Sequence, residues 1–142
     1  MKDIKYTLRG VTIEQFAILF EPSSDGIEIL LNIPIRLNYL EHTVAVGANA
    51  QFLEGDKVFM VAEVFCHYMI EPECWRELSE SDSKDVTLPK AFINSLAGIA
   101  ISSARGVLCA KTEKTPFAKY FLPLVVVDPA QIRDVIIPKP EI

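Results

Sequence analysis

Two histidines and three cysteines are the side chains of this 142-residue chain best suited to metal binding or nucleophilic chemistry. The cysteines are Cys66, Cys74 and Cys109; His67 directly follows Cys66, and His42 lies apart. A structural zinc site needs four convergent ligands, whereas adjacent residues of a strand point to opposite faces. Cys66 and His67 therefore do not share a metal ion readily, and we expect neither a metal site nor a cofactor.

Motifs for covalent catalysis and phosphate binding are also missing. A Cys–His nucleophile pair needs the two side chains within hydrogen-bond reach, but Cys66 lies in an apolar segment typical of an inert core residue. The sequence has no Gly-x-Ser-x-Gly elbow. Residues 106–112 end in Lys-Thr like a phosphate-binding loop, yet Arg105 and Ala110 replace its two glycines. We therefore predict a protein that is not an enzyme.

A run of carboxylates follows residue 70. A catalytic carboxylate pair needs an apolar pocket that raises the pKa of one member, and this run is polar throughout. It is most simply a solvated linker over residues 71–85, with the acidic residues Glu71, Glu73, Glu77, Glu80, Asp82 and Asp85.

Composition excludes several classes of partner. The net charge of −5 opposes nucleic-acid binding, which depends on neutralising phosphates with Lys and Arg. No apolar run reaches the roughly 18–20 residues that span a bilayer, so we expect no membrane insertion. The odd, low cysteine count and the absence of an apolar secretory start predict a reducing, cytoplasmic location. Half of the residues are nevertheless apolar, and this excess predicts a subunit interface or a surface for apolar partners.

The first two thirds of the chain read as strands of a single domain spanning residues 1–142. Residues 5–20 are rich in β-branched and aromatic side chains and contain no turn signal, with Gly10 as a candidate bulge. Residues 27–39 alternate apolar and polar side chains with period two, and Pro34 predicts an edge strand or a bulge there.

A hairpin follows, formed by residues 43–53 and 57–70 around Glu54-Gly55-Asp56. One face of its second arm is apolar throughout. The opposite face mixes charged side chains with large apolar ones. In a sheet with one solvated face, that face would be mainly polar. This second face carries Lys57, Phe59, Val61, Glu63, Phe65, His67 and Met69.

A long helix is predicted from residue 90 to about residue 111, with Thr87 as a candidate cap and Pro89 in its first turn. Its apolar and small residues surround the helix, which is typical of burial on more than one side. Gly98, Ser102 and Gly106 cost helix propensity in a solvated helix, so we expect them to line a contact with a second subunit.

The end of the chain is predicted to be a short irregular segment. Thr115-Pro116 precedes an aromatic and then Val-rich stretch, and a helical turn is expected over residues 130–135. Because the strands are grouped and do not alternate with helices, the fold class is α+β. The prediction is a four-stranded antiparallel sheet with one long helix packed on it.

The order of these segments resembles the SecB family of protein-export chaperones, including the SecB-like chaperones of some toxin–antitoxin systems. The likeness covers roughly residues 6–128. It rests on Phe20-Glu21-Pro22 after the first strand, on Phe59, Val61, Glu63 and Val64 in the hairpin, on Ala104-Arg105 in the helix, and on Thr115-Pro116-Phe117, Leu122-Pro123-Leu124 and Val127-Asp128 after it.

The resemblance implies a dimer of dimers, with a long apolar groove that holds unfolded polypeptides without ATP. Its candidate partners are unfolded or pre-export chains, the SecA export motor and a toxin–antitoxin protein. The alternatives are a binding module dedicated to one partner such as an antitoxin, and a small-molecule-binding domain on the same scaffold. The predicted client-binding residues are the large groups off the main core face, Phe16, Phe20, Phe59, Phe65, Met69 and Trp75, with Phe117, Tyr120 and Phe121 after the helix.

Overall fold

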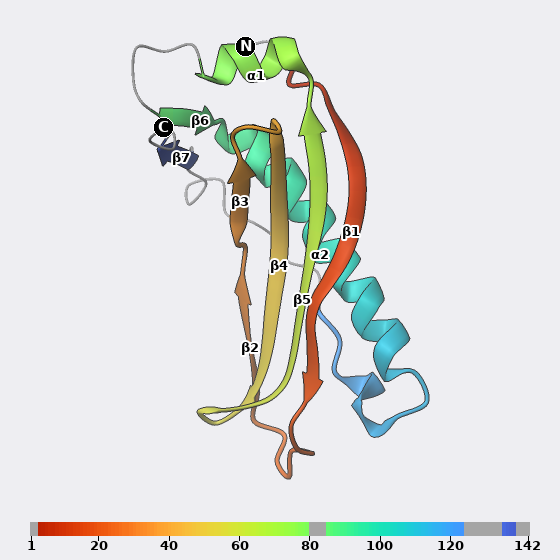
Figure 1. Cartoon of the computed structure of the whole chain (residues 1–142). Helices are drawn as coiled ribbons and strands as arrows, with labels where there is room; N and C mark the ends of the chain where they lie inside the picture. Colours follow the sequence, from red (N-terminus) through yellow and green to blue (C-terminus); the bar gives the residue numbers. More distant parts are fainter. Residues whose placement is uncertain (1–2, 80–84, 124–134, 139–142) are drawn as a thin grey trace.

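A computed structural model of the chain describes residues 3–79, 85–123 and 135–138. The fold is α+β, with a long helix packed on one face of an antiparallel sheet (Figure 1). The sheet order is β1-β5-β4-β2, and β3 also pairs with β4. Its strands are β1 (Tyr6–Ile18), β2 (Ile27–Asn32), β3 (Ile35–Asn38), β4 (Thr43–Glu54) and β5 (Lys57–Ile70).

The edge strand predicted over residues 27–39 is two strands, so the sheet has five strands in place of the predicted four. The break is at Ile33-Pro34, where proline has no N–H to donate to the ladder. The carbonyl of Pro34 still accepts a hydrogen bond of 2.8 Å from the Gly47 N–H of β4. The position of Pro34 at a sheet edge is therefore confirmed, and β2 and β3 lie end to end along β4 (Figure 1).

The predicted hairpin is confirmed. β4 and β5 pair from Thr43↔Met69 to Glu54↔Lys57, and Gly55 has a φ of 64°, a left-handed conformation that favours glycine. The register shifts where Phe52 faces Met60 but Leu53 faces Val58. The extra residue at this bulge is Phe59, which belongs to the core cluster and is fully buried. The prediction that Phe59 lies on the second face is wrong, because the bulge interrupts the alternation.

The long helix α2 (Lys90–Thr112) packs across β4 and β5. Its N-cap is Pro89, and the predicted cap Thr87 lies in the preceding strand β6 (Asp85–Leu88) instead. The sheet-facing side is buried at Phe92, Leu96, Ala100, Ala104 and Leu108 among others. By length and composition alone α2 could span a membrane, a property that it shares with core helices of soluble proteins; 44% of its apolar window is buried.

Two further predictions need correction. The segment predicted as a linker contains the helix α1 (Pro72–Ser79), whose Trp75 is buried. The C-terminal part is more regular than expected: η1 (Pro116–Lys119) follows α2, and β7 (Val135–Pro138) pairs with β6 in a small second sheet. The turn predicted over residues 130–135 lies outside the described residues, except for Val135, which begins β7.

Candidate polypeptide-binding surfaces

On the face of the sheet where α2 packs, the side chains of β1 are apolar but exposed. α2 crosses β4 and β5 and leaves this outer strand largely uncovered. Four aliphatic side chains of β1 share the face of α2 through their cross-strand partners on β5 and are 38–51% exposed. We call them the β1 strip: Leu8, Val11, Ile13 and Ile18.

The apolar surface continues from the β1 strip onto α2. Val11 pairs with Cys66, whose thiol lies 3.5 Å from the Ser103 hydroxyl of α2. Ile99, one turn before Ser103, is 39% exposed. β1 is also the end of the sheet order, so its outer edge has no partner among the described strands. An extended chain finds both unpaired backbone groups and apolar contacts here.

A sequence signal for the β1 strip exists. The register of β1 shifts between Leu8 and Gly10 and again between Ile13 and Gln15. Each shift adds one residue, so the apolar positions on the α2 side follow spacings of two and three. The series is Tyr6, Leu8, Val11, Ile13, Phe16 and Ile18. Strict period two hides this pattern, and so the open strip is missed from sequence.

Four of the predicted client residues meet in one aromatic cluster at the lower end of the sheet, on the α2 side. Phe59 is its centre: Phe20 lies 6.0 Å away and Tyr120 5.0 Å away between ring centroids. Phe117 lies 6.5 Å away, and Phe52, which sequence reasoning did not single out, lies 6.3 Å away. Phe59 is fully buried, while Phe20, Phe117 and Tyr120 are half-buried.

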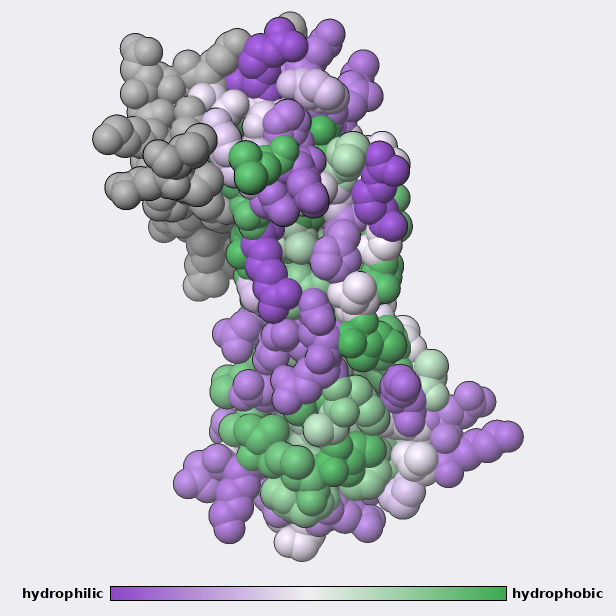
Figure 2. All heavy atoms as spheres, in the orientation of Figure 1, coloured by the Kyte–Doolittle hydropathy of each residue, from purple (hydrophilic) through white to green (hydrophobic). Residues whose placement is uncertain are grey.

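The other face of the sheet, which we call the open face, is turned toward the viewer in Figure 1. Polar side chains predominate over its upper and middle parts, with smaller apolar areas among them, and a larger apolar patch lies over the lower ends of the strands (Figure 2). By register, Leu30, Leu53 and Val61 lie on this face at the lower ends of the strands. Leu30 is 49% exposed, whereas Leu53 and Val61 are buried.

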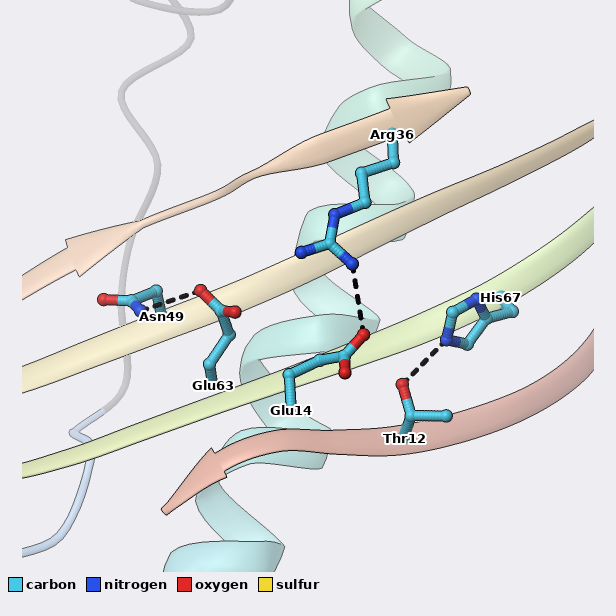
Figure 3. Close-up of polar contacts among 6 residues, drawn as sticks. All are labelled: Thr12, Glu14, Arg36, Asn49, Glu63 and His67. Atoms are coloured by element: carbon cyan, nitrogen blue, oxygen red, sulfur yellow. Dashed lines mark hydrogen bonds and ion pairs between the residues drawn. The ribbon is translucent and has the colours of Figure 1, made fainter. Parts of the chain in front are cut away.

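Polar contacts connect the strands across the middle of the open face. They join Asn49 to Glu63, Thr12 to His67, and Arg36 to Glu14 (Figure 3). The Arg36–Glu14 ion pair, 3.1 Å long, connects one outer strand to the other over the two central strands. Glu14 is the extra residue of the second β1 bulge, which directs its side chain over this face.

Phe65, a predicted client residue, lies beneath this ion pair. The Arg36 guanidinium is 4.1 Å from the ring centroid of Phe65. On the other side the ring contacts Gly47, where an added Cβ would be 2.9 Å from it. Phe65 is fully buried although none of the described helices covers its face of the sheet. It is therefore closed to a partner in this conformation.

The remaining predicted client residues are dispersed. Met69 lies near the upper end of the open face, where its sulfur accepts a contact of 3.0 Å from Arg9. Trp75 stacks on His42 with 4.8 Å between centroids and is 4% exposed. Phe16 is half-buried on the α2 side of β1, and Phe121 is 59% exposed beyond the aromatic cluster.

The predicted subunit-contact residues lie on the outer side of α2. Gly98, Ser102 and Gly106 are exposed, and a Cβ added at either glycine would meet nothing within 4 Å. The exposed Cys109 lies three residues further along. This side of α2 is thus available to a second helix, as the prediction requires.

The candidate chemical residues do not converge. Cys66 is buried, and His67 contacts the Thr12 hydroxyl at 2.8 Å. Over the described parts of the chain, no group of three or more His, Cys, Asp and Glu side chains could hold a metal ion. A shallow hollow beside His67 on the open face is lined by Arg36, Leu37, Asn38, Thr43, Val44 and Ala45.

Glu54 anchors the connection between β1 and β2. One of its oxygens accepts hydrogen bonds from the Ser24 hydroxyl and from the N–H groups of Ser24 and Ser23, at 2.6–2.8 Å. These bonds hold the pKa of Glu54 below its ordinary value, the Ser24 hydroxyl contributing most. Because the folded state favours the charged carboxylate, this anchor stabilises the fold at neutral pH and is lost as pH falls through the lowered pKa.

Comparisons of the chain with protein families, with characterised proteins and with solved structures found no match. The functional proposal therefore rests on the surfaces described above.

Proposed function

We propose that this protein binds unfolded or extended polypeptide segments and holds them without nucleotide. The observation that carries the proposal is the β1 strip beside an unpaired strand edge. An edge strand in a soluble monomer is usually protected by charges, proline or a covering element. β1 carries two bulges, at the charged residues Arg9 and Glu14, but it has thirteen residues, contains no proline and exposes apolar side chains along its length.

The dimensions suit a polypeptide. A thirteen-residue strand is about 40 Å long at about 3.3 Å per residue. An extended segment of about a dozen residues could pair with this edge and place alternate side chains on the β1 strip. Backbone pairing is independent of sequence, which suits a holding chaperone with many clients, the function that the resemblance to SecB implies.

A second copy of the chain could also cover exposed apolar surface, in competition with a client. We propose that copies associate through the outer side of α2 at Gly98, Ser102 and Gly106, since small residues let two helices approach closely. That arrangement leaves the β1 strip to clients. A dedicated partner, such as an antitoxin, is the alternative occupant of the strip.

The test is suppression of light scattering by chemically unfolded proteins at near-equal molar ratio without ATP. We expect the wild type to suppress aggregation and Val11→Asp to lose this activity. Thr7→Asp adds the same charge to an exposed position on the opposite face of β1 and should stay active. Failure of the wild type with several unrelated substrates would refute general holding and favour the dedicated partner.

A further inference from the structure

Residues 116–123, which we call the strap, cover the aromatic cluster from the side of α2. The strap starts with η1 and continues through Tyr120 to Pro123. It contributes Phe117 and Tyr120 to the contacts with Phe59, and Leu122 to the core, where it is 1% exposed. The buried side chains of the strap thus follow the pattern aromatic-x-x-aromatic-x-leucine.

The strap has few polar connections to the rest of the fold. Within the described chain, its hydrogen bonds to other elements come from Arg105 of α2. The Arg105 guanidinium donates to the carbonyls of Leu122 and Pro123 at 2.7 and 2.8 Å. The other bonds are local, such as those of the Thr115 cap to Thr112 and Phe117. Apart from the Arg105 bonds, apolar packing holds the strap on the fold, so loss of these two bonds should raise the population in which the strap is open.

The cluster beneath the strap is continuous with the β1 strip. Ile18 and Phe20 lie on the α2 side of the same chain, and Phe20 contacts Phe59. A polypeptide lying along the strip toward its lower end would therefore reach Phe20 and meet the strap. The aromatic rings beneath the strap would then be the next apolar groups that this polypeptide could contact.

We propose that the strap is an internal occupant of a second polypeptide-binding site, formed by Phe20, Phe52 and Phe59, and that a client segment displaces Phe117 and Tyr120 from it. This proposal rests on the proposed function and adds that the strap regulates client binding. The displacing segment carries two aromatic residues three positions apart and an apolar residue two positions later. Arg105 sets the closed population, because its two charge-assisted hydrogen bonds are lost when the strap leaves.

The main test compares the full-length wild type with Arg105→Met, which keeps the apolar stem of the side chain but removes the donors. The binding-competent fraction limits apparent affinity, so loss of charged hydrogen bonds should tighten client binding about 10-fold. Affinity is measured by fluorescence anisotropy with a labelled unfolded peptide. Ile101→Val, a mild truncation of the α2 core, controls for general loosening and should leave affinity unchanged.

A peptide of residues 115–123 supplied in trans tests the site without reference to a client. It should bind Arg105→Met more tightly than the wild type and compete with client there, whereas the same peptide with both aromatics replaced by serine should not. Unchanged client affinity in Arg105→Met, with no binding of the strap peptide, would overturn the proposal. The proposed function would survive that result if the wild type still suppresses aggregation and Val11→Asp does not.

Discussion

The two edges of the sheet are built differently. The β2–β3 edge is broken after six residues by Ile33-Pro34, and the strand beyond the break has only four residues. The β1 edge runs for thirteen residues without proline. Proline and short strands are two of the means by which proteins prevent edge pairing, and bulges and charges are others. β1 carries two single-residue bulges, at Arg9 and Glu14, but it is neither short nor broken by proline. One edge is therefore interrupted, and the other is left longer and able to pair.

The side chains follow the same division. On the α2 side, Ile29, Leu31, Ile33 and Ile35 of the β2–β3 edge pack against the core. The corresponding side of β1 leaves Leu8, Val11 and Ile13 about half exposed. α2 lies over β4 and β5, and β5 is the only described element that packs extensively against β1. The comparison therefore predicts that the proposed polypeptide binding takes place at the β1 edge.

The sharpest way to break this comparison is to place the same charge on both edges. Ile13 of β1 and Leu30 of β2 are 48% and 49% exposed, so lysine at either position should leave the fold intact. Burial of one large aliphatic side chain is worth about 1.5–3 kcal/mol. Because Ile13 is already about half-buried, the burial lost is worth about half of this. Ile13→Lys should therefore weaken client binding by about 3- to 10-fold, while Leu30→Lys should change it less than about 2-fold.

Fluorescence anisotropy with an unfolded peptide measures this difference, and native mass spectrometry separates it from self-association. Gly106→Leu should lower the native mass without loss of client binding, because it lies on the outer side of α2. Equal loss in both lysine variants would show that the edges do not differ in function. A lower native mass for Ile13→Lys would assign the β1 strip to a second copy.

Much of this edge architecture is predictable from sequence. The period-two alternation of residues 27–39 and the proline within them predict an edge strand, and the turn at Gly55 fixes the hairpin. The long helix is predictable because its apolar pattern is sustained over 23 residues. In each case the signal is local and periodic.

The candidate site was only partly predictable, because bulges and long-range contacts decide exposure. One inserted residue turns Phe59 into the core, and two others move the apolar positions of β1 out of strict alternation. Phe65 is buried by Arg36, which lies 29 positions earlier in the sequence. The acidic segment before α2 conceals α1 because its charges outnumber the side chains that pack, chiefly Trp75.

A second comparison sets an edge glycine against a central one. Gly47 in β4 lies against the Phe65 ring, which an added Cβ would approach to 2.9 Å, whereas Gly10 in β1 has no neighbour within 4 Å of an added Cβ. Overpacking costs about 1–3 kcal/mol, so Gly47→Ala should lower the free energy of unfolding by that amount. Gly10→Ala should change it by less than about 0.5 kcal/mol. Urea unfolding measures both, and similar values for the two variants would contradict the tight contact at Phe65.

The smallest expected effect concerns the ion pair that joins the two edges. Arg36 is 60% exposed and Glu14 36% exposed, so the pair gains little Coulomb energy. Exposed pairs contribute about 0.2–1 kcal/mol, and Glu14→Gln should destabilise the fold within that range, less at high salt. Its larger consequence should be steric: without its carboxylate partner, the guanidinium covers Phe65 less often.

Binding of a hydrophobic dye should therefore rise in Glu14→Gln while the unfolding midpoint barely moves. Glu28→Gln, which removes the same charge from an exposed position on the open face of β2, serves as the charge control and should not increase dye binding. Unaltered dye binding in Glu14→Gln would show that contact with Gly47 and the neighbouring strands is enough to bury Phe65. Packing alone would then bury Phe65 on the open face, and the difference between the two edges would not depend on the Arg36–Glu14 ion pair.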